Sequence, residues 1–172
     1  MTIRFLAISS ICILLVCCKK NTENDTTKEA NASKNSIITE LDIKALQYTD
    51  FGLDQRAKQL VEPWEAYQNL EGTITAIKTA DFSFFETDEK ATLELVKSLK
   101  ESIPDTLNTP SIYSRIKIVE TMLYKTEDVT TLTNIPKPEV AKTIKDLFVS
   151  FSNLNFQINK KIEKDNRKIV RP

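Results

Sequence analysis

Few side chains of this chain have the types and spacing that acid–base or nucleophilic chemistry needs. The 172 residues include no histidine, which excludes a Ser-His-Asp triad, a Cys-His pair and histidine ligands for zinc or haem. Pairs of acids remain, such as Glu62 with Glu65 and Asp88 with Glu89, and two carboxylates could serve as general acid and base. Each pair lies at the start or on the flank of an expected helix, so we interpret them as solvated charges and predict no catalytic residue.

One short pattern is typical of a nucleophile. Ser114 and Lys117 have the Ser-x-x-Lys spacing that is found in serine acylating enzymes. Those enzymes also need Ser-Asp-Asn and Lys-Thr-Gly elements, and this sequence contains neither. We therefore interpret the match as chance, and we expect a protein that is not an enzyme and that holds no metal and no cofactor.

The three cysteines are confined to the N-terminus, at positions 12, 17 and 18. The rest of the chain can therefore form neither a disulfide nor a thiolate metal site. A mostly apolar run from Phe5 to Val16 precedes the last two cysteines, Arg4 lies before it, and Lys19 and Lys20 follow. This run of about 12 residues is shorter than the ~20 that a membrane-spanning helix needs, and the arrangement is typical of a signal peptide.

The end of this run, Leu15, Val16, Cys17 and Cys18, resembles the lipobox of bacterial lipoproteins, which prefers a leucine three places before the lipidated cysteine and a small residue just before it. Lipidation of Cys17 would put the branched Val16 at the small position, so Cys18 is the better candidate; an ordinary cleaved signal peptide is the alternative. The resemblance implies a lipoprotein signal peptide over residues 1–17 and a lipid anchor on Cys18, with acyl chains such as palmitate. It also implies attachment to the cell envelope of a Gram-negative bacterium, at the outer membrane or the periplasmic face.

The segment after the cysteines has the composition of a flexible tether. Residues 19–35 contain no aliphatic side chain larger than alanine, so they cannot bury enough apolar surface to offset the entropy lost on ordering. We predict a tether over residues 18–36 and a helical domain over residues 37–172. At ~5 to 6 Å times the square root of its length, a tether of ~18 residues holds that domain ~20 to 25 Å from the membrane.

The composition favours one helical domain without a polyanionic partner. Two glycines leave little material for hairpin turns or phosphate-binding loops, and 172 residues of which 41% are hydrophobic suit a single core. Lys plus Arg and Asp plus Glu each number 24, whereas nucleic-acid binders usually present a basic face. We therefore expect no nucleic acid partner.

A stripe of apolar residues predicts one long helix from Pro138 to about Asp165. Its members recur every three or four positions, and Pro138 and Glu139 suit the first turn. A helix of this length, ~42 Å at ~1.5 Å per residue, needs several neighbours to cover it, so we expect an all-α fold, an antiparallel four-helix bundle. The stripe consists of Val140, Ile144, Leu147, Phe151, Leu154 and Ile158.

Three further helices and one ambiguous segment complete the expected bundle. The apolar spacing, the caps and the prolines predict helices over residues 54–77, with a kink or a division at Pro63, over 87–103, and from Thr109 to about residue 126. A polar connection over residues 127–136 leads to the long helix. Residues 37–51 suit either a short helix or an extended strap.

Some positions in these helices imply particular surroundings. Trp64, Tyr67 and Tyr113 are aromatic residues at helical spacing, so we expect core positions rather than a ligand pocket. Asn155 lies ~55° from the centre of the long stripe, and we expect it to be half-buried and bonded to another helix.

The back of the long helix carries two apolar residues, Val149 and Phe156, roughly 155° to 175° from the centre of the stripe at ~100° per residue. Two apolar side chains on an otherwise polar face need a cover. We expect the segment 37–51 to supply it. The alternative is that Val149 and Phe156 form an exposed interaction patch, which docks a partner or a second copy.

These features predict a lipid-anchored cell-envelope protein that acts by non-catalytic binding or scaffolding, with the membrane and an envelope protein as its candidate partners. In this it is similar to the small helical envelope lipoproteins of unknown function, a resemblance that implies no site residues. The alternative is a carrier or sensor of a small apolar ligand bound between helices. An enzyme that uses carboxylates alone is the third interpretation, and it would need two acids that converge in a cleft.

Overall fold

The structure is a computed structural model that describes residues 38–88 and 90–167. The expected signal peptide, the lipid position Cys18 and the tether lie outside these residues. Within the described ranges the chain forms seven helices and no strand, so the predicted all-α class is confirmed and the predicted number of four helices is wrong. The helices are α3 (Glu40–Lys44), α4 (Gln55–Val61), α5 (Glu65–Lys78), α6 (Ser83–Thr87), α7 (Ala91–Glu101), α8 (Pro110–Thr131) and α9 (Lys137–Asn166).

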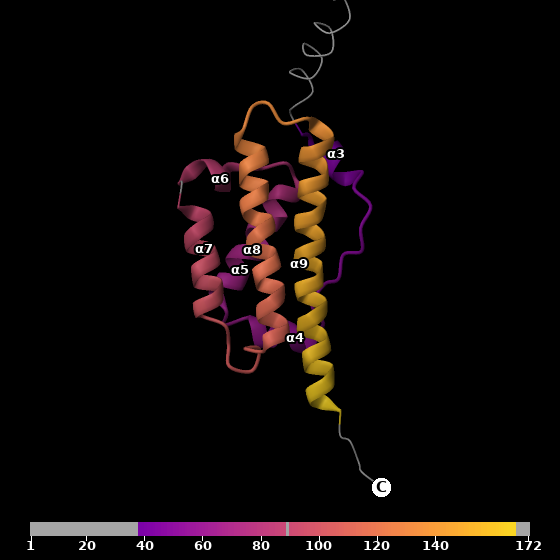
Figure 1. Ribbon diagram of the computed structural model, residues 1–172. Coiled ribbons are helices and arrows are strands. Elements are labelled where there is room, and N and C mark those ends of the chain that lie inside the picture. The colour runs from indigo at the N-terminus through magenta and orange to yellow at the C-terminus, as the bar shows by residue number, and fades with distance from the viewer. Residues whose placement is uncertain (1–37, 89, 168–172) are drawn as a thin grey trace, which may run out of the picture.

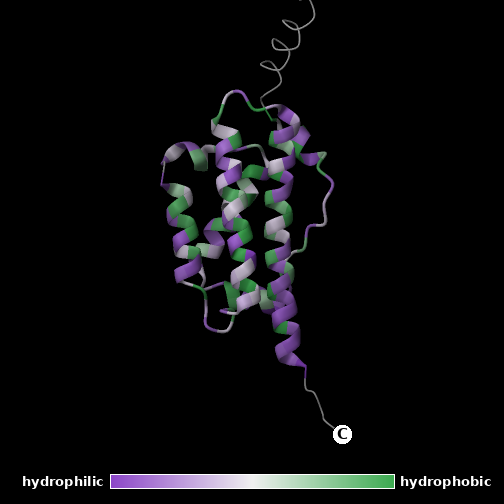
Figure 2. Ribbon diagram, viewed as in Figure 1, coloured by the Kyte–Doolittle hydropathy of each residue, from purple (hydrophilic) through white to green (hydrophobic). Residues whose placement is uncertain are grey.

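The four longer helices determine the shape of the molecule. In Figure 1, α7, α8 and α9 run side by side with α8 in the middle, and α5 lies behind them and packs on α7. Most apolar residues of these helices are buried in one shared core, while polar residues dominate the free end of α9 (Figure 2). No helix among the described residues has both the length and the apolar character that crossing a membrane requires.

The long helix α9 forms where the apolar stripe predicts it, one residue earlier than expected. Pro138 lies in its first turn together with Glu139, and Lys164 lies in its last turn, so the charges complement the helix dipole. All six residues of the predicted stripe are buried. Residues on the flanks of the stripe, among them Phe148 and Asn155, are also buried, because α9 has neighbours on more than one side.

The helix α8 begins as predicted and ends later than predicted. The Thr109 hydroxyl accepts a hydrogen bond from the amide of Ile112 (3.3 Å), and Pro110 lies at the helix start. The helix continues to Thr131, so the expected connection over 127–136 is wrong and the loop spans only 132–136. The polar residues remain helical because Val129 among them packs against the core, and their hydroxyls bond to carbonyls one turn earlier, as in Thr130 to Thr126 (2.7 Å) and Thr131 to Glu127 (2.8 Å).

A proline divides the first predicted helix into α4 and α5. The Asp54 carboxylate accepts the amide of Ala57 (2.8 Å) and caps α4, as expected, and the chain turns at Pro63 before α5 begins. Trp64 and Tyr67 are buried, at 1% and 0% exposure, so their predicted core positions are confirmed. The same prediction is wrong for Tyr113, which is 42% exposed because it lies about 100° away from its buried neighbour Ile112 around α8.

The predicted break over residues 80–86 contains a helix, α6, and this displaces the start of α7. Thr87 was expected to cap the next helix, but it ends α6, and its hydroxyl donates to the carbonyl of Ser83 (2.7 Å). The short helix forms because Phe85 is buried in the core, at 5% exposure, which holds this segment against the bundle. The following helix α7 therefore begins at Ala91 and ends at Glu101, inside the predicted bounds.

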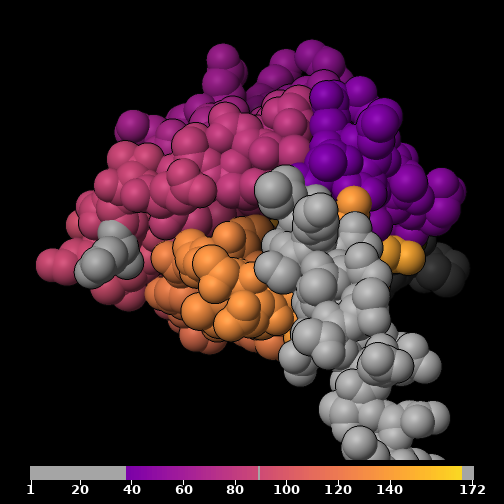
Figure 3. Space-filling model, turned by 90° about the horizontal axis from the view of Figure 1, so that it is seen from above, coloured from indigo at the N-terminus to yellow at the C-terminus, as the bar shows by residue number. Residues whose placement is uncertain are grey.

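Both forms expected for residues 37–51 occur in succession. Thr39 and Asp42 form a reciprocal capping box at the start of α3. After α3 the chain is extended and follows α9 down to α4 (Figure 1); we call residues 45–54 the strap. Figure 3 shows the molecule from the end that holds the α8–α9 loop. The N-terminal elements (indigo), the middle helices (magenta) and the end of α8 (orange) cover different parts of this surface.

Candidate functional site

A ladder of polar side chains on α9 holds the strap. Ser152, Asn155 and Asn159 follow one another at steps of three and four residues, which places them on one flank of the helix. Together they make five hydrogen bonds to the strap, and all five use main-chain atoms of the strap. An isolated extended segment satisfies its amides and carbonyls with water, so this ladder takes the place that a neighbouring strand has in a sheet.

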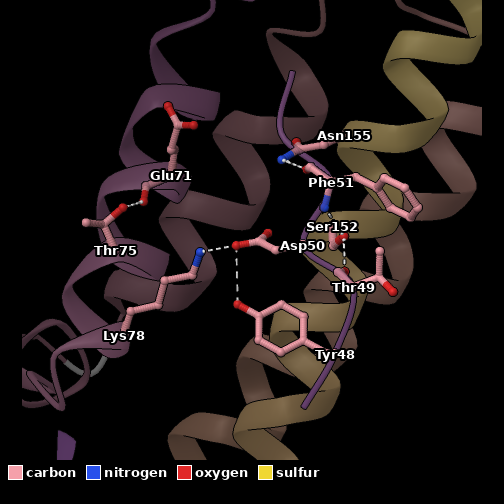
Figure 4. A network of polar contacts seen from close by, with 9 residues as sticks. All are labelled: Tyr48, Thr49, Asp50, Phe51, Glu71, Thr75, Lys78, Ser152 and Asn155. Carbon is pink, nitrogen blue, oxygen red and sulfur yellow. Dashed lines mark hydrogen bonds and ion pairs between the residues drawn. The ribbon is translucent and has the colours of Figure 1, made fainter. Parts of the chain in front are cut away.

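The individual bonds of the ladder are short and continuous along the strap. Ser152 Oγ donates to the carbonyl of Thr49 (2.7 Å) and accepts the amide of Phe51 (2.7 Å), and Asn155 Nδ2 donates to the carbonyl of Phe51 (3.1 Å), as Figure 4 shows. One turn further along α9, Asn159 Nδ2 donates to the carbonyl of Gly52 (2.8 Å) and its Oδ1 accepts the amide of Asp54 (3.0 Å).

Asn155 joins three parts of the fold. Besides the strap, it contacts α5, where the Tyr67 hydroxyl donates to Asn155 Oδ1 (2.7 Å). The predicted bond to another helix is confirmed, and the residue is more buried than expected, at 3% exposure, because the strap covers it from outside. Burial raises the pKa of Tyr67 far above its ordinary value, so this hydroxyl remains a donor across the whole physiological range.

An ion pair fixes the N-terminal part of the strap to α5. Lys78 Nζ lies 2.7 Å from Asp50 Oδ2, and Tyr48 Oη donates weakly to the same oxygen (3.4 Å) (Figure 4). The Tyr48 ring packs on Phe148 of α9, with ring centroids 5.5 Å apart. Burial disfavours the charged form of Lys78, but the hydrogen bond and the charge of Asp50 outweigh it, so the pKa of Lys78 is raised.

The predicted contact between Phe156 and the segment 37–51 is confirmed. The rings of Phe51 and Phe156 lie with their centroids 4.8 Å apart, and Lys160 Nζ lies 5.6 Å from the centre of the Phe156 ring. Each phenylalanine keeps 39% exposure. The strap therefore supplies a partner ring for Phe156 but leaves the pair accessible from outside.

Val149, the second residue of the predicted patch, has different neighbours. It lines a shallow groove of about 130 Å³ between α8 and α9, whose other lining residues include Ile118, Met122 and Asn153. Ile118 is 42% exposed. We call the surface formed by Phe51, Ile118, Met122, Val149 and Phe156 the α9 face.

Sequence reasoning missed part of this surface and its support. Ile118 and Met122 lie outside the apolar stripe of α8, and only their spacing of four residues, one helical turn, indicates a second and weaker apolar strip. The ladder also has a sequence signal, since Ser152, Asn155 and Asn159 share one flank of a predicted helix. That spacing does not indicate which segment the ladder binds.

The chemically suggestive pairs of the sequence do not come together as sites. Ser114 Oγ donates to the carbonyl of Pro110 (2.7 Å), and Lys117 pairs with Glu120 (2.8 Å). Glu62 and Glu65 are both exposed. The described residues include no group of three or more acidic, histidine or cysteine side chains placed to hold a metal ion.

A second hollow lies at the end of the bundle near the start of α3. This cleft of about 320 Å³ is lined mainly by apolar side chains, with Glu86 and several threonines at its edge. Leu132 in its wall is 58% exposed, so the cleft is open to solvent. Its apolar lining residues are Ile38, Phe82, Val129, Leu132, Ile135 and Val140.

Comparisons of this chain with protein-family models, with curated proteins and with solved structures found no match. No relative therefore lends a residue or a role to the site. The candidate site consists of the α9 face and the ladder that supports it, and its description depends on the geometry above.

Proposed function

We propose that this chain is a lipid-anchored cell-envelope protein that acts by non-catalytic binding, and that the α9 face is its docking surface. The anchor is the lipid expected on Cys18, and the tether over residues 18–36 gives the domain freedom to meet a partner. In this proposal α5, α7, α8 and α9 form an antiparallel four-helix bundle that serves as the scaffold of the docking surface.

The observation that supports binding is the rigid support of an exposed aromatic pair. Phe51 belongs to an extended segment, where a phenylalanine would ordinarily be mobile. The side chains of Ser152 and Asn155 form hydrogen bonds with its main chain and hold it beside Phe156. Aromatic side chains that are ordered before a partner arrives lose little conformational entropy on binding. Aromatic residues, phenylalanine among them, are also enriched in protein interfaces relative to the rest of the surface.

Site-specific photo-crosslinking in cells tests the docking surface. A photoreactive phenylalanine analogue at Phe156 is expected to crosslink to an envelope protein. The matched control is the same analogue at Tyr113, which has a similar exposure, 42% against 39%, but lies about 140° from Ile118 around α8 at ~100° per residue. Equal crosslinking at both positions, or crosslinking at Tyr113 alone, would contradict the proposed surface.

Mass spectrometry of the mature N-terminus tests the anchor. We expect diacylglycerol on Cys18, and we expect the Cys18→Ser variant to leave the membrane fraction. A mature protein that begins elsewhere without lipid would contradict the anchor, while the crosslinking result would stand independently.

A small apolar ligand is the second candidate function, and the cleft of about 320 Å³ favours it. Ligand pockets commonly have volumes of ~300 to 1,000 Å³ and mostly apolar walls. A fluorescent fatty acid is expected to bind the unaltered chain with one-to-one stoichiometry. The Thr130→Trp variant, whose indole fills the cleft, is expected to bind it much more weakly. Unchanged binding by that variant would exclude the cleft as the ligand site.

A further inference from the structure

The α9 face has two apolar anchor points on one line. Val149 lies in the groove between α8 and α9, and Phe156 lies seven residues further along the same helix, in contact with Phe51. Seven residues are two helical turns, or ~10.5 Å at ~1.5 Å per residue. A second helix that runs along α9 would present its own residues i and i+7 at the same separation.

The first anchor point is concave. Two neighbouring helices form the walls of the groove, and Ile118, Met122 and Val149 supply apolar surface inside it. A protruding leucine or phenylalanine of a docked helix would fill this hollow, whereas the flat surface of a bilayer would leave it empty. The shape therefore favours a helix over a membrane.

The surroundings of these anchor points are basic. The whole chain has 24 basic and 24 acidic side chains, but five basic residues lie on the sides of α8 and α9 that carry the anchors. Arg115 lines the groove, and the four lysines are placed there by helical spacing. Two acids share the strip, Asp146 in a pair with Lys142 (2.6 Å) and Glu163 in a pair with Lys160 (2.7 Å). The basic residues are Arg115, Lys125, Lys142, Lys145 and Lys160.

We propose that the α9 face docks an acidic amphipathic helix of a partner protein. This inference rests on the proposed function and names the chemistry of its partner. The apolar stripe of the partner helix contacts Val149 and Phe156, and its acidic flanks lie against the lysines and Arg115. Such charge complementarity sets partner choice and association rate more than it sets the maximum affinity.

Synthetic peptides of about three heptads test this inference with the full chain in detergent. Three peptides share one leucine stripe and differ only in their flanks, which carry glutamate, glutamine or lysine. Fluorescence anisotropy is expected to show the glutamate peptide binding about tenfold more tightly than the lysine peptide, with an affinity that falls as salt rises. The double variant Lys145→Glu/Lys160→Glu is expected to reverse this preference.

Two further variants locate the peptide. Val149→Ala and Phe156→Ala are expected to weaken the glutamate peptide about fivefold or more, while Tyr113→Ala leaves its affinity unchanged. Circular dichroism confirms that each variant is folded. Loss of binding in Tyr113→Ala, or unchanged binding in both other variants, would overturn the inference.

The remaining outcomes separate the inference from the proposed function. Equal affinity for the three peptides, or a preference that survives the double charge reversal, would overturn the acidic partner while crosslinking at Phe156 still supported a docking surface. Binding to vesicles of anionic phospholipid without binding to any peptide would overturn it in favour of a lipid surface. Failure of the Phe156 crosslink would instead contradict the proposed function itself.

Discussion

The buried amide of Asn155 provides the sharpest test of the structure. Replacing Asn155 by alanine removes the acceptor of the Tyr67 hydroxyl and the donor to the carbonyl of Phe51 in one step. The Tyr67 hydroxyl is then left buried without its partner, since Tyr67 has 0% exposure. The Phe51 carbonyl lies in an exposed residue, so water can replace the lost amide there.

The loss at the buried Tyr67 hydroxyl should therefore cost more free energy than the loss at the Phe51 carbonyl, which water can reach. A buried donor without a partner costs ~1 to 3 kcal/mol, and an ordinary hydrogen bond contributes ~0.5 to 1.5 kcal/mol net. We therefore expect Asn155→Ala to lower the free energy of unfolding by roughly 2 to 4 kcal/mol. This is a large fraction of the ~5 to 15 kcal/mol of a typical domain.

A double-mutant cycle measured by urea unfolding isolates the buried bond. Tyr67→Phe alone leaves the amide oxygen of Asn155 unpaired, but the double variant Tyr67→Phe/Asn155→Ala leaves neither group unpaired. We expect the double variant to cost less than the sum of the single ones by ~0.5 to 3 kcal/mol. Asn153→Ala on the partly exposed groove is the control and should change stability by less than ~0.5 kcal/mol. Additive single costs, or a cost of Asn155→Ala below that of the control, would refute the reasoning.

Three other variants test separate parts of the fold. Phe151→Ala should lower the free energy of unfolding by ~3 to 5 kcal/mol in urea through lost burial and a cavity; a loss below ~1 kcal/mol would mean that this residue is not core. The pKa of Asp42 is lowered from 3.8 to about 2, chiefly by its hydrogen bond with Lys137, so its carboxylate stabilises the fold above pH 3.8 and this contribution disappears toward pH 2. The free energy of unfolding of Asp42→Asn should therefore fall less between about pH 4 and pH 2 than that of the unaltered chain. An equal fall in both would exclude a role for the pair of Asp42 and Lys137. Ser152→Ala removes the acceptor of the Phe51 amide, so hydrogen exchange at that amide should become faster; unchanged protection there would mean that the ladder does not hold the strap.

Local rules account for the elements that the sequence predicted well. The stripe of α9, the caps at Asp54 and Thr109, and the division at Pro63 each depend on residues within a few positions of one another. Such short-range preferences act before any tertiary contact exists. The contact of Phe156 with the strap was also predictable, because two apolar residues two turns apart on an otherwise polar face, Val149 and Phe156, indicate a segment that packs over them.

The elements that the sequence predicted poorly depend on distant partners. The helix α6 forms where the aromatic residues around Phe85 meet the core, and Tyr113 is exposed because no neighbouring helix covers its side of α8 in the described part of the chain. Residues 127–131 at the end of α8 have the composition of a polar loop, yet Val129 packs against the core and the Thr130 hydroxyl bonds to the carbonyl of Thr126 within the helix. In each case the local composition was compatible with two states, and tertiary burial selected one.

By itself the sequence determined the all-α class, the position of α9 and the need for a cover on its back. Only the tertiary structure decided that Ser152, Asn155 and Asn159 bind the main chain of the strap, and that Val149 lies in a groove against α8. The physical reason is that apolar periodicity fixes which side of a helix is buried. The partner of a polar side chain, in contrast, depends on which distant backbone atoms the packed core brings within hydrogen-bonding distance.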